Sequence, residues 1–209
     1  MTTRGKKNER EMANWLRSAL PAPDEATLSR SRARIASWFK SITPTIRWGE
    51  MSSPLGTVYV AVTAKGLCAV DFGRRETKFL ARFEPRTRLE KDSSAVQEAI
   101  DQLREYFAGE RNTFRLPVDL ALLTPFQRSV LETACRIHPG QVWTYQRVAQ
   151  EMGRPKSSRP VGQALAHNPV PIIIPCHRVI ASDGSLGGYS GGSGLTAKRW
   201  LLRLEGVPL

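Results

Sequence analysis

Two stretches near the N-terminus carry apolar residues at helical spacing, with polar residues between them. The first covers residues 8–20, and the segment PAPD at 21–24 separates it from the second, at residues 28–42. Apolar residues that recur every three or four positions predict amphipathic helices. We expect a helical extension that packs on its own protein, with a contact to DNA, a partner or a membrane surface as the alternative.

The pattern then changes to short apolar runs with the composition of β-strands. Residues 57–63 and 67–72 predict two strands, and the AKG turn between them predicts an antiparallel hairpin. Residues 93–108 return to helical spacing, with Ser93 or Ser94 as the N-cap and a glycine directly after the last turn. Strands followed by a helix predict a small α/β domain in the middle of the chain.

The last part of the chain begins with another helix. Thr124 and Pro125 have the residue types of an N-cap and a first helical turn, and the apolar positions after them predict a helix that ends at residues 138–140. Cys135 lies near its end. Because free cysteine usually behaves as a small buried hydrophobe, we expect Cys135 in the core.

Two short helices joined by a turn are predicted next. Residues 144–152 form the first, the sequence GRP at 153–155 interrupts it, and the second runs from residue 157 or 158 to residue 167. Such a pair in a basic segment is typical of a helix-turn-helix. The second helix carries Arg159 in its first turn. Its outer surface is predicted to hold small residues that let another surface approach closely: Gly162, Ala164 and Ala166.

The sequence PIIIPCHRVI at 171–180 holds the strongest sign of chemistry. Its apolar residues predict a buried strand that ends at Pro175 and presents Cys176, His177 and Arg178. A neighbouring imidazole and a cation can lower the pKa of a thiol and supply the thiolate, which is the nucleophilic form. A glycine-rich segment follows at 183–194. Such a loop can bring backbone N–H groups close to a ligand.

Charge is distributed unevenly along the chain. The 209 residues carry a formal net charge of +12: residues 1–49 and 125–209 each carry ten Lys/Arg against four Asp/Glu, whereas residues 50–124 carry eleven of each sign. Basic surfaces at both ends suit a polyanion such as nucleic acid. A generally arginine-rich composition is the alternative.

The number of cysteines and the length of the apolar runs limit which classes of protein remain possible. The three cysteines are far apart and form no CxxC pair, which argues against a disulfide framework or a Cys-rich zinc site. The chain has no apolar run of about 18 residues, and its first residues lack the apolar core of a signal peptide. We expect an intracellular protein with reduced thiols and no membrane span.

Three sequence blocks, NPVPIIIPCHRVI, YSGG and KRWLLRLEG, resemble the O6-alkylguanine-DNA alkyltransferases, the methylated-DNA–protein-cysteine methyltransferase family. The segment SPLGTVYVAVTAKGLCAVDFG resembles that family's N-terminal domain. The resemblance implies an α+β protein: a small ribonuclease-H-like α/β domain with an antiparallel sheet, then an all-α winged-helix or helix-turn-helix-like DNA-binding domain. We expect a basic helical extension at 1–45, the α/β domain at 46–122, and the DNA-binding and alkyl-acceptor domain at 123–209.

The resemblance also implies roles for single residues in moving an alkyl group from O6 of guanine to sulfur. Cys176 would accept the alkyl group, and His177 would act as a base through a water. Glu205 would orient His177 and stabilise its charge. Asn168 would brace the acceptor site, and Tyr145 would hydrogen-bond the guanine and help to protonate it as the leaving group.

Further residues would contact the DNA. Arg159 would occupy the stack that a flipped nucleotide leaves, and Ser190 and the carbonyl of Val179 would contact the base, with Tyr189 adding a polar contact. In this family the second helix of the pair enters the minor groove, which small residues permit. Those residues are Gly162 and Ala166.

The implied activity is direct-reversal DNA repair in a single turnover, because the thioether product offers no carbonyl for water to attack. The substrate would be O6-alkylguanine in duplex DNA, with O4-alkylthymine as a second candidate, and the nucleotide would rotate out of the helix. No cofactor and no metal are expected. We expect a monomer, with cooperative binding to DNA left open, in the cytoplasm and associated with the nucleoid.

Three other classes of protein remain as alternatives. A lesion-binding protein would flip the base without chemistry, but such relatives lack the acceptor cysteine. A Cys-His hydrolase would form a thioester and turn over repeatedly, and would leave the helix pair unexplained. A transcription regulator would use the thiol as an alkylation sensor and the extension as its contact to a partner or operator.

The chain departs from the family pattern at two places. Ser193 and Gly194 stand between YSGG and Leu195, where the family usually continues directly with a leucine. We expect these two residues to lengthen the rim of the pocket and to change which alkyl groups fit. The basic extension is the second departure, and we expect it to add nonspecific affinity for DNA.

Overall fold

The structure, a computed structural model, describes residues 24–42 and 45–208, without the side chains of residues 36–42. The chain divides into two units, Met1–Thr43 and Pro44–Leu209. The helix expected at 8–20 lies outside the described residues. The second expected helix is confirmed as α2, Glu25–Ile42, on which Arg30, Arg32 and Arg34 are exposed. What its apolar side packs against stays a prediction.

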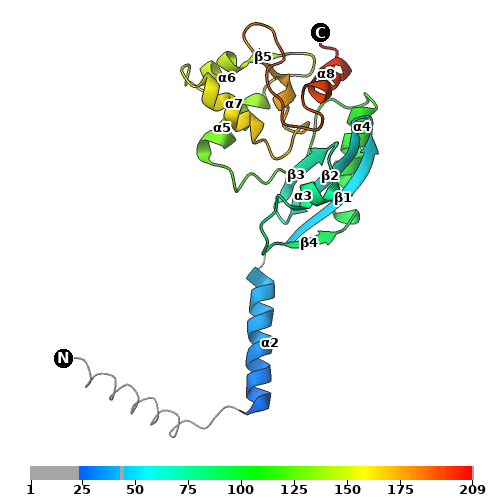
Figure 1. Cartoon of the computed structure of the whole chain (residues 1–209), viewed down its shortest axis with the longest axis vertical. Helices are drawn as coiled ribbons and strands as arrows, with labels where there is room; N and C mark the ends of the chain where they lie inside the picture. The colour runs from blue at the N-terminus through cyan, green and yellow to red at the C-terminus, as the bar shows by residue number, and fades with distance from the viewer. Residues whose placement is uncertain (1–23, 43–44, 209) are drawn as a thin grey trace, which may run out of the picture. The chain divides into compact units, whose positions relative to one another are not determined.

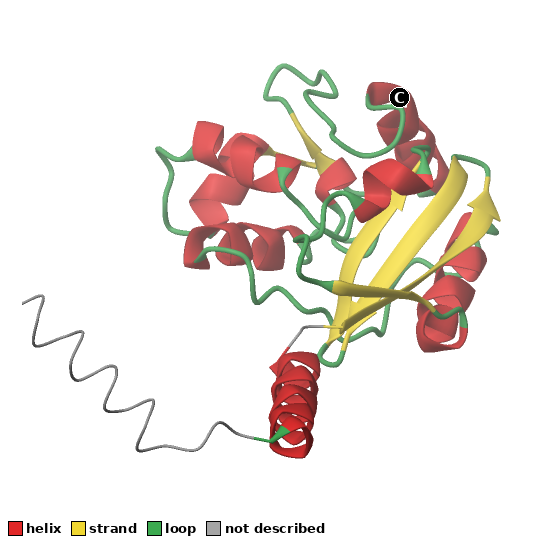
Figure 2. Cartoon of the chain, turned by 60° about the horizontal axis from the view of Figure 1, so that its bottom comes forward, coloured by secondary structure: helices red, strands yellow, loops and turns green. Residues whose placement is uncertain are grey.

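The larger unit begins with a four-stranded sheet in the order β3-β2-β1-β4 (Figures 1 and 2). The expected hairpin is confirmed, because β2 pairs antiparallel with β3, and β1 adds antiparallel on the other side of β2. The expectation of a purely antiparallel sheet is wrong, since β4 pairs parallel with β1. A long connection runs from β3 through α3 to the opposite edge of the sheet. Because β4 is not joined to its neighbour by a hairpin, it can pair in the parallel direction. The bounds are β1 Thr45–Ser53, β2 Gly56–Thr63, β3 Gly66–Phe72, α3 Glu76–Leu80 and β4 Arg88–Lys91.

The helix expected at 93–108 is present as a 3-10 turn, Ser94–Val96, followed by α4, Gln97–Phe107. Its predicted apolar face is confirmed at Val96, Ile100 and Leu103, which are buried. The predicted serine cap is wrong. The carboxylate of Asp92 accepts from the backbone N–H groups of Ser94 and Ala95 at 3.1 and 3.2 Å, because a charged acceptor satisfies two N–H groups of a first turn at once.

The remainder is mostly helical, and a short parallel strand pair, β5 with β6, lies among the helices. The N-cap at Thr124 and the pair α6–α7 agree with the expected start of this part and with the expected helix-turn-helix. Helix α5 ends at Ala134, earlier than expected, and Cys135 follows as its C-cap. Cys135 is exposed rather than in the core, because it stands where the helix stops. The bounds are α5 Pro125–Ala134, β5 Trp143–Thr144, α6 Tyr145–Glu151, α7 Ser158–Ala166, β6 Val179–Ile180 and α8 Leu195–Leu204.

One apolar core runs through the sheet and the helices. It includes Val70 and Phe72 of β3 together with Val130 of α5 and Leu201 of α8. The backbone also joins the two parts, because the N–H of Val70 donates to the carbonyl of Pro169 at 2.9 Å. Strand β3 therefore lies directly beside the segment that leads to Cys176.

Candidate active site

The segment before Cys176 is a tight turn and not the expected strand. Only an isolated bridge joins Pro171 to Ile174, and the N–H of Ile174 donates to the carbonyl of Val170 at 3.0 Å. The two prolines in PIIIP have no N–H for a strand ladder. Ile172 adopts φ 76°, which is unusual for a β-branched residue, and it is held there fully buried. The apolar side chains of PIIIP predicted correctly that this segment is buried. Its backbone hydrogen bonds, however, join residues a few positions apart and do not form a strand ladder.

Asn168 takes the place of the missing strand partners. Its Nδ2 donates to the carbonyl of Ile174 at 2.8 Å, and its Oδ1 accepts from the N–H of Val170 at 3.0 Å. The same Nδ2 lies 3.1 Å from the sulfur of Cys176. One buried amide thus holds the turn and lies within hydrogen-bond distance of the thiol.

Cys176 begins a 3-10 turn, Cys176–Arg178, and is 6% exposed. Burial raises the pKa of its thiol to about 11, while the hydrogen bond from Asn168 and the positive charge of Lys198 act in the opposite direction. The expectation that His177 and Arg178 lower this pKa is therefore wrong: burial outweighs the groups that lower it, and the cation among them is Lys198. At neutral pH the group is a thiol, and a base must remove its proton for it to react.

His177 and Glu205 form a buried pair beside the thiol-bearing turn. The Nε2 of His177 lies 3.0 Å from Oε1 of Glu205. Burial lowers the pKa of His177, so the imidazole is neutral at pH 7 and can accept a proton. Its Nδ1 is buried and has no hydrogen-bond partner among the described residues. An imidazole with one nitrogen fixed and the other unpartnered suits a general base.

Arg178 neutralises the carboxylate and does not face the thiol as a free cation. Its Nε and Nη2 donate to the two oxygens of Glu205 at 2.8 and 2.9 Å, and its Nη1 donates to the carbonyl of Ile137. Burial alone would raise the pKa of Glu205, but hydrogen bonds from His177 and Arg178 outweigh it and lower this pKa to about 2. Glu205 is therefore ionised and fixed in position.

Tyr106 is a member of this network that sequence reasoning missed. Its hydroxyl donates to Oε1 of Glu205 at 2.8 Å from helix α4, so the sheet domain supports the His177–Glu205 pair. Its position on the apolar face of α4, next to Leu103, was a signal of burial. A buried phenol needs a hydrogen-bond partner, but the sequence does not reveal a partner 99 positions away.

Lys198 is a second functional residue that sequence reasoning missed. It is fully buried on α8, and its ammonium donates to the carbonyls of Val179, Leu186 and Gly188. Burial lowers its pKa to about 8. Its spacing from Leu201 and Leu202 places it on the buried face of α8, which was a usable signal. Lys198 ties the glycine-rich loop to the turn that carries the thiol.

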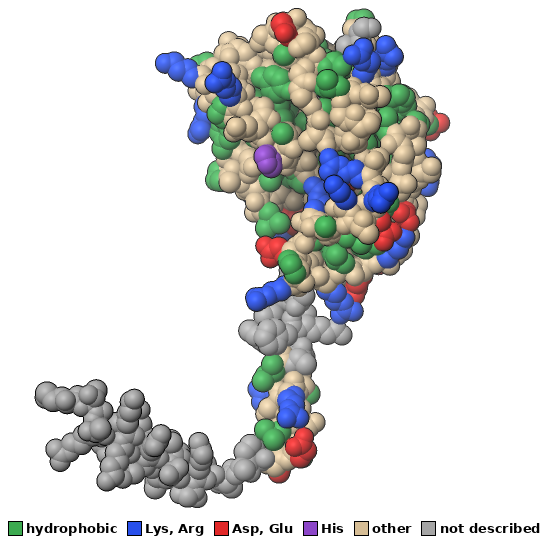
Figure 3. All heavy atoms as spheres, in the orientation of Figure 1, with side chains coloured by type: hydrophobic (Ala, Val, Ile, Leu, Met, Phe, Trp, Pro, Cys, Tyr) green, Lys and Arg blue, Asp and Glu red, His purple; other side chains and the backbone are tan. Residues whose placement is uncertain are grey.

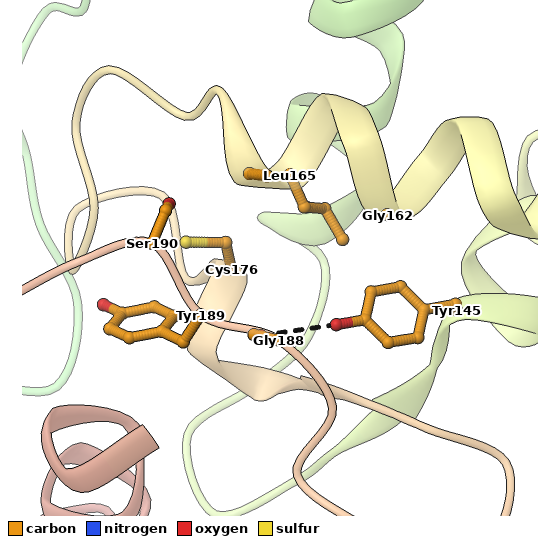
Figure 4. A pocket seen from close by; sticks show the side chains of 8 residues that line it. Tyr145, Gly162, Leu165, Cys176, Gly188, Tyr189 and Ser190 are labelled. Atoms are coloured by element: carbon orange, nitrogen blue, oxygen red, sulfur yellow. Dashed lines mark hydrogen bonds between the residues drawn. The ribbon is translucent and has the colours of Figure 1, made fainter. Parts of the chain in front are cut away.

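A cavity of about 220 Å³ opens beside the thiol. Figure 4 shows Cys176 between Leu165 of α7 and Ser190 of the glycine-rich loop, with Tyr189 on the loop side. The hydroxyl of Tyr145 reaches the Gly188 carbonyl at 3.4 Å. The cavity is lined by Tyr145, Gly162, Leu165, Ala166, Cys176, Gly188, Tyr189 and Ser190.

An open groove of about 620 Å³ adjoins this cavity and shares four lining residues with it. Arg159 and Gln163 of α7 line the groove, and Arg159 is exposed. Gly162 of α7 faces the Tyr145 ring, since a Cβ at this position would lie 3.6 Å from it. The expectation that Ala164 lies on the outer surface is wrong, because Ala164 is buried. The shared residues are Tyr145, Gly162, Ala166 and Gly188.

The structure separates the sequence-predicted residues into three places. The cavity and its groove are lined by Cys176 and by six other residues predicted from the sequence: Tyr145, Arg159, Gly162, Ala166, Tyr189 and Ser190. His177, Glu205 and Asn168 lie behind the thiol. Val179 follows the Cys176–Arg178 turn as its C-cap and does not line the cavity; it is fully buried, and its carbonyl accepts from Lys198. The hydroxyl of Tyr189 is buried and has no partner among the described residues.

The two additional loop residues do not line the cavity. The lining ends at Ser190, and the N–H of Gly194 donates to the carbonyl of Gly191 at 2.9 Å, which closes a turn that contains Ser193. Gly194 has φ 66° and precedes the first residue of α8. The additional residues therefore form a turn at the entrance to α8.

Within residues 24–42 and 45–208, no helix is long and apolar enough to cross a membrane. The same ranges hold no group of three or more His, Cys, Asp or Glu side chains that could bind a metal ion.

The fold and the site together define a class of protein. A buried thiol with a neutral imidazole beside it lies in a cavity that opens onto a helix-turn-helix pair, which is the arrangement of a DNA-binding protein with a cysteine nucleophile. Residues 125–207 match the family described as "6-O-methylguanine DNA methyltransferase, DNA binding domain". Residues 46–120 match "6-O-methylguanine DNA methyltransferase, ribonuclease-like domain".

Relatives with curated names agree with these matches. The methylated-DNA–protein-cysteine methyltransferase of Methanosarcina barkeri is 41% identical over 158 residues, which cover 74% of this chain and 94% of the relative. The protein of the same name from Saccharolobus islandicus is 41% identical over 162 residues, covering 78% and 97%. The chain therefore belongs to the O6-methylguanine DNA methyltransferase family. It is a methylated-DNA–protein-cysteine methyltransferase, which repairs O6-alkylguanine by alkyl transfer to a cysteine.

Solved structures show the same relationship. The crystal structure of Mycobacterium tuberculosis OGT in complex with DNA superimposes with a TM-score of 0.67 and 36% identity, covering 76% of this chain and 92% of that one. The O6-methylguanine-DNA methyltransferase from Pyrococcus kodakaraensis gives a TM-score of 0.57 at 25% identity, covering 78% and 99%. The predicted family, α+β fold and DNA-binding activity are thus confirmed.

Proposed function

We propose that Cys176 is the alkyl acceptor and that it is used once. The observation that carries this assignment is the position of its sulfur at a cavity of about 220 Å³ that opens onto the groove lined by Arg159. Of the other cysteines, Cys135 is exposed at the end of α5 and Cys68 lies on β3, and neither lines this cavity. Only a thiol beside a cavity can meet a base that leaves the duplex.

Transfer begins with removal of the thiol proton. Because burial holds the thiol pKa near 11, the proton passes through a water to neutral His177, and the imidazolium is stabilised by ionised Glu205. The thiolate then attacks the alkyl carbon, so that the S–C bond forms while the C–O6 bond breaks. Tyr145 hydrogen-bonds the departing guanine and supplies a proton to it, and the proton held by the imidazolium of His177 is released to water, from which Tyr145 is reprotonated. The products are a thioether at Cys176 and an unmodified guanine.

We propose that the damaged nucleotide rotates out of duplex DNA through the groove along α7. Arg159 fills the stack that it leaves, and the small residues Gly162 and Ala166 admit the helix to the minor groove. Ser190 contacts the extruded base. The carbonyl of Val179 also contacts the base in this proposal, since a carbonyl oxygen has two lone pairs and Lys198 uses one of them.

We propose three segments for the chain: a basic extension at 1–45, a ribonuclease-like domain at 46–122 and the acceptor domain at 123–209. The family matches at 46–120 and 125–207 support the second and third. The core shared between Val70, Phe72 and Leu201 indicates that these two domains fold as one body. A monomer bound to duplex DNA is the proposed working form.

Repair stoichiometry tests the assignment. Duplex DNA with O6-methylguanine is titrated with protein, and restored guanine is counted. The wild-type protein and Cys135→Ala should each restore about one lesion per molecule and then stop, because thioethers are not hydrolysed, whereas Cys176→Ala should restore none. Continued turnover, or repair by Cys176→Ala, would overturn the proposal. A parallel duplex with O4-methylthymine measures whether that lesion is also a substrate.

A further inference from the structure

The glycine-rich loop forms one wall of the acceptor cavity through Gly188, Tyr189 and Ser190. Six of the twelve residues at 183–194 are glycines. Glycine allows many backbone conformations, so contacts from outside the loop must select one of them. On one side the acceptor domain supplies these contacts, through Lys198 and the hydroxyl of Tyr145.

The end of strand β3 holds the other side of this loop. The Nη2 of Arg74 donates to the carbonyl of Ser190 at 2.9 Å, across 116 positions of sequence. The carboxylate of Asp71 lies 3.7 Å from the Nε of Arg74 and pairs with it. The guanidinium is thereby directed at the loop residue that lines the cavity.

The loop also packs closely on Phe72. A Cβ on Gly191 would lie 2.9 Å from the Phe72 ring, and a Cβ on Gly192 would lie 2.5 Å from it. A Cβ on Gly73 would in turn meet the Cα of Gly192 at 3.5 Å. Three consecutive residues of the ribonuclease-like domain, Phe72 to Arg74, thus contact the loop from Ser190 to Gly192.

We propose that Arg74 is a positioning residue that sets the wall of the acceptor cavity, and that the ribonuclease-like domain thereby controls which alkyl groups reach Cys176 at full rate. The proposal rests on Cys176 being the acceptor. Arg74 touches neither substrate nor sulfur. It acts by holding Ser190, and small misplacements of such a wall slow an in-line displacement strongly.

A neighbouring arginine offers a matched control. Arg74, Arg75 and Lys78 line a surface hollow of about 540 Å³ beside α3, and Lys and Arg side chains gather on the front of this body in Figure 3. Arg75 is exposed and precedes α3 as its N-cap residue. Arg75→Ala therefore removes the same charge from the same hollow and leaves the bond to Ser190 intact. Any general effect of charge on DNA affinity appears in both variants.

The experiment compares Arg74→Ala, Arg74→Lys and Arg75→Ala with the wild-type protein. Second-order rate constants are measured for O6-methylguanine in duplex DNA and for the free base O6-benzylguanine. For Arg74→Ala we expect a fall of about tenfold with the methyl substrate and a smaller fall with the bulkier benzyl substrate. Arg74→Lys keeps a donor and should recover part of the loss, and Arg75→Ala should match wild type in the ratio of the two rates.

Hydrogen exchange supplies a second readout that does not depend on activity. The backbone N–H groups of residues 186–194 should exchange faster in Arg74→Ala than in Arg75→Ala, while melting temperatures stay alike. Equal rate ratios and equal exchange in the two alanine variants would overturn the proposal. Alkylation of wild-type protein at a residue other than Cys176 would instead overturn the acceptor assignment, so the two failures are distinguishable.

Discussion

At the scale of single residues, the site depends on one ionised carboxylate. Glu205 accepts hydrogen bonds from His177, Arg178 and Tyr106, and its side chain is 2% exposed. A buried carboxylate is stable only when its charge is paired and its oxygens are satisfied. The network therefore fixes the imidazole and, in the mechanism that we propose, stabilises the charge that it acquires when the thiol loses its proton.

Acid should destabilise the network of His177 and Glu205. The folded-state pKa of His177 is lower than its ordinary 6.5, and that of Glu205 is lowered from 4.5 to about 2. Both shifts favour proton uptake by the unfolded chain, so their stabilising contributions are present above the unfolded pKa and decline as pH falls. Urea unfolding should show a free energy that decreases from about pH 6.5 downward, with the Glu205 part lost between pH 4.5 and about 2.

Glu205→Gln isolates the carboxylate's share of this effect. At pH 7 it should lower the free energy of unfolding by about 3 kcal/mol, because Arg178 stays buried next to a neutral amide. The matched control is Glu151→Gln, which removes an exposed pair with Arg136 and should cost less than about 1 kcal/mol. Equal losses in the two variants would contradict the assigned network.

Cys176, His177 and Asn168 stand close together along the chain, so the sequence alone suggested that they form one site. Glu205 lies 28 positions from His177, and only the family resemblance indicated that these two residues pair. Lys198 and Tyr106 were missed because their partners lie 10 to 99 positions away. Burial could be predicted for both from helical spacing, but the identity of a distant partner could not.

At the scale of elements, helix α7 connects the open groove to the cavity. It contributes Gly162 and Ala166 to both the cavity and the groove, and Arg159 to the groove alone. The helix-turn-helix therefore places Arg159 about one turn before Gly162, which lines the cavity beside the thiol. This arrangement suits removal of a nucleotide from the stack.

Arg159→Ala tests this use of α7. Repair of O6-methylguanine in duplex DNA should slow by about tenfold, because Arg159 no longer offsets the free-energy cost of unstacking the nucleotide. Alkylation by free O6-benzylguanine should change less than about twofold. Arg104→Ala is the control, since Arg104 is an exposed arginine of α4 paired with Asp101. Equal slowing with both substrates would show that Arg159 serves the structure of the cavity and not the flipped state.

Elements differ in how well the pattern predicts them. The hairpin and helices α4 to α7 followed from periodicity, and the start of α5 also followed from its threonine cap, because local sequence determines both features. The run PIIIP reads as a strand, yet it forms a turn through the side chain of Asn168. The parallel pairing of β4 with β1 depends on a connection that crosses the sheet, which periodicity does not report.

At the scale of the whole molecule, the two family domains share one core, so the sheet domain is part of the active site. Tyr106 supports Glu205, and Arg74 contacts Ser190. The sequence indicated two domains from the change in pattern and charge. It could not indicate that residues near position 73 shape the cavity around Cys176.

The basic extension adds a prediction at this scale. Residues 1–44 carry nine Lys/Arg against four Asp/Glu, and three arginines of α2 are exposed. Each phosphate neutralised contributes about 0.9 to the slope of log affinity against log salt. Deleting residues 1–44 should weaken binding to undamaged duplex and reduce that slope by about 2 to 3.

Substitution of Arg30, Arg32 and Arg34 by Gln in the full chain is the control for the deletion. It should reproduce most of the change in slope, because it removes charge and leaves the extension in place. Unchanged affinity across the salt series would remove any role of the extension in DNA binding.

We propose that the sulfur of Cys176 takes the alkyl group and keeps it. The mass of the intact protein, followed by a peptide map, tests this directly after incubation with duplex DNA that contains O6-methylguanine. We expect a single added methylene group, located on the peptide with Cys176 and stable over time. An unmodified protein after repair, or a methyl group found on Cys68 or Cys135, would contradict it.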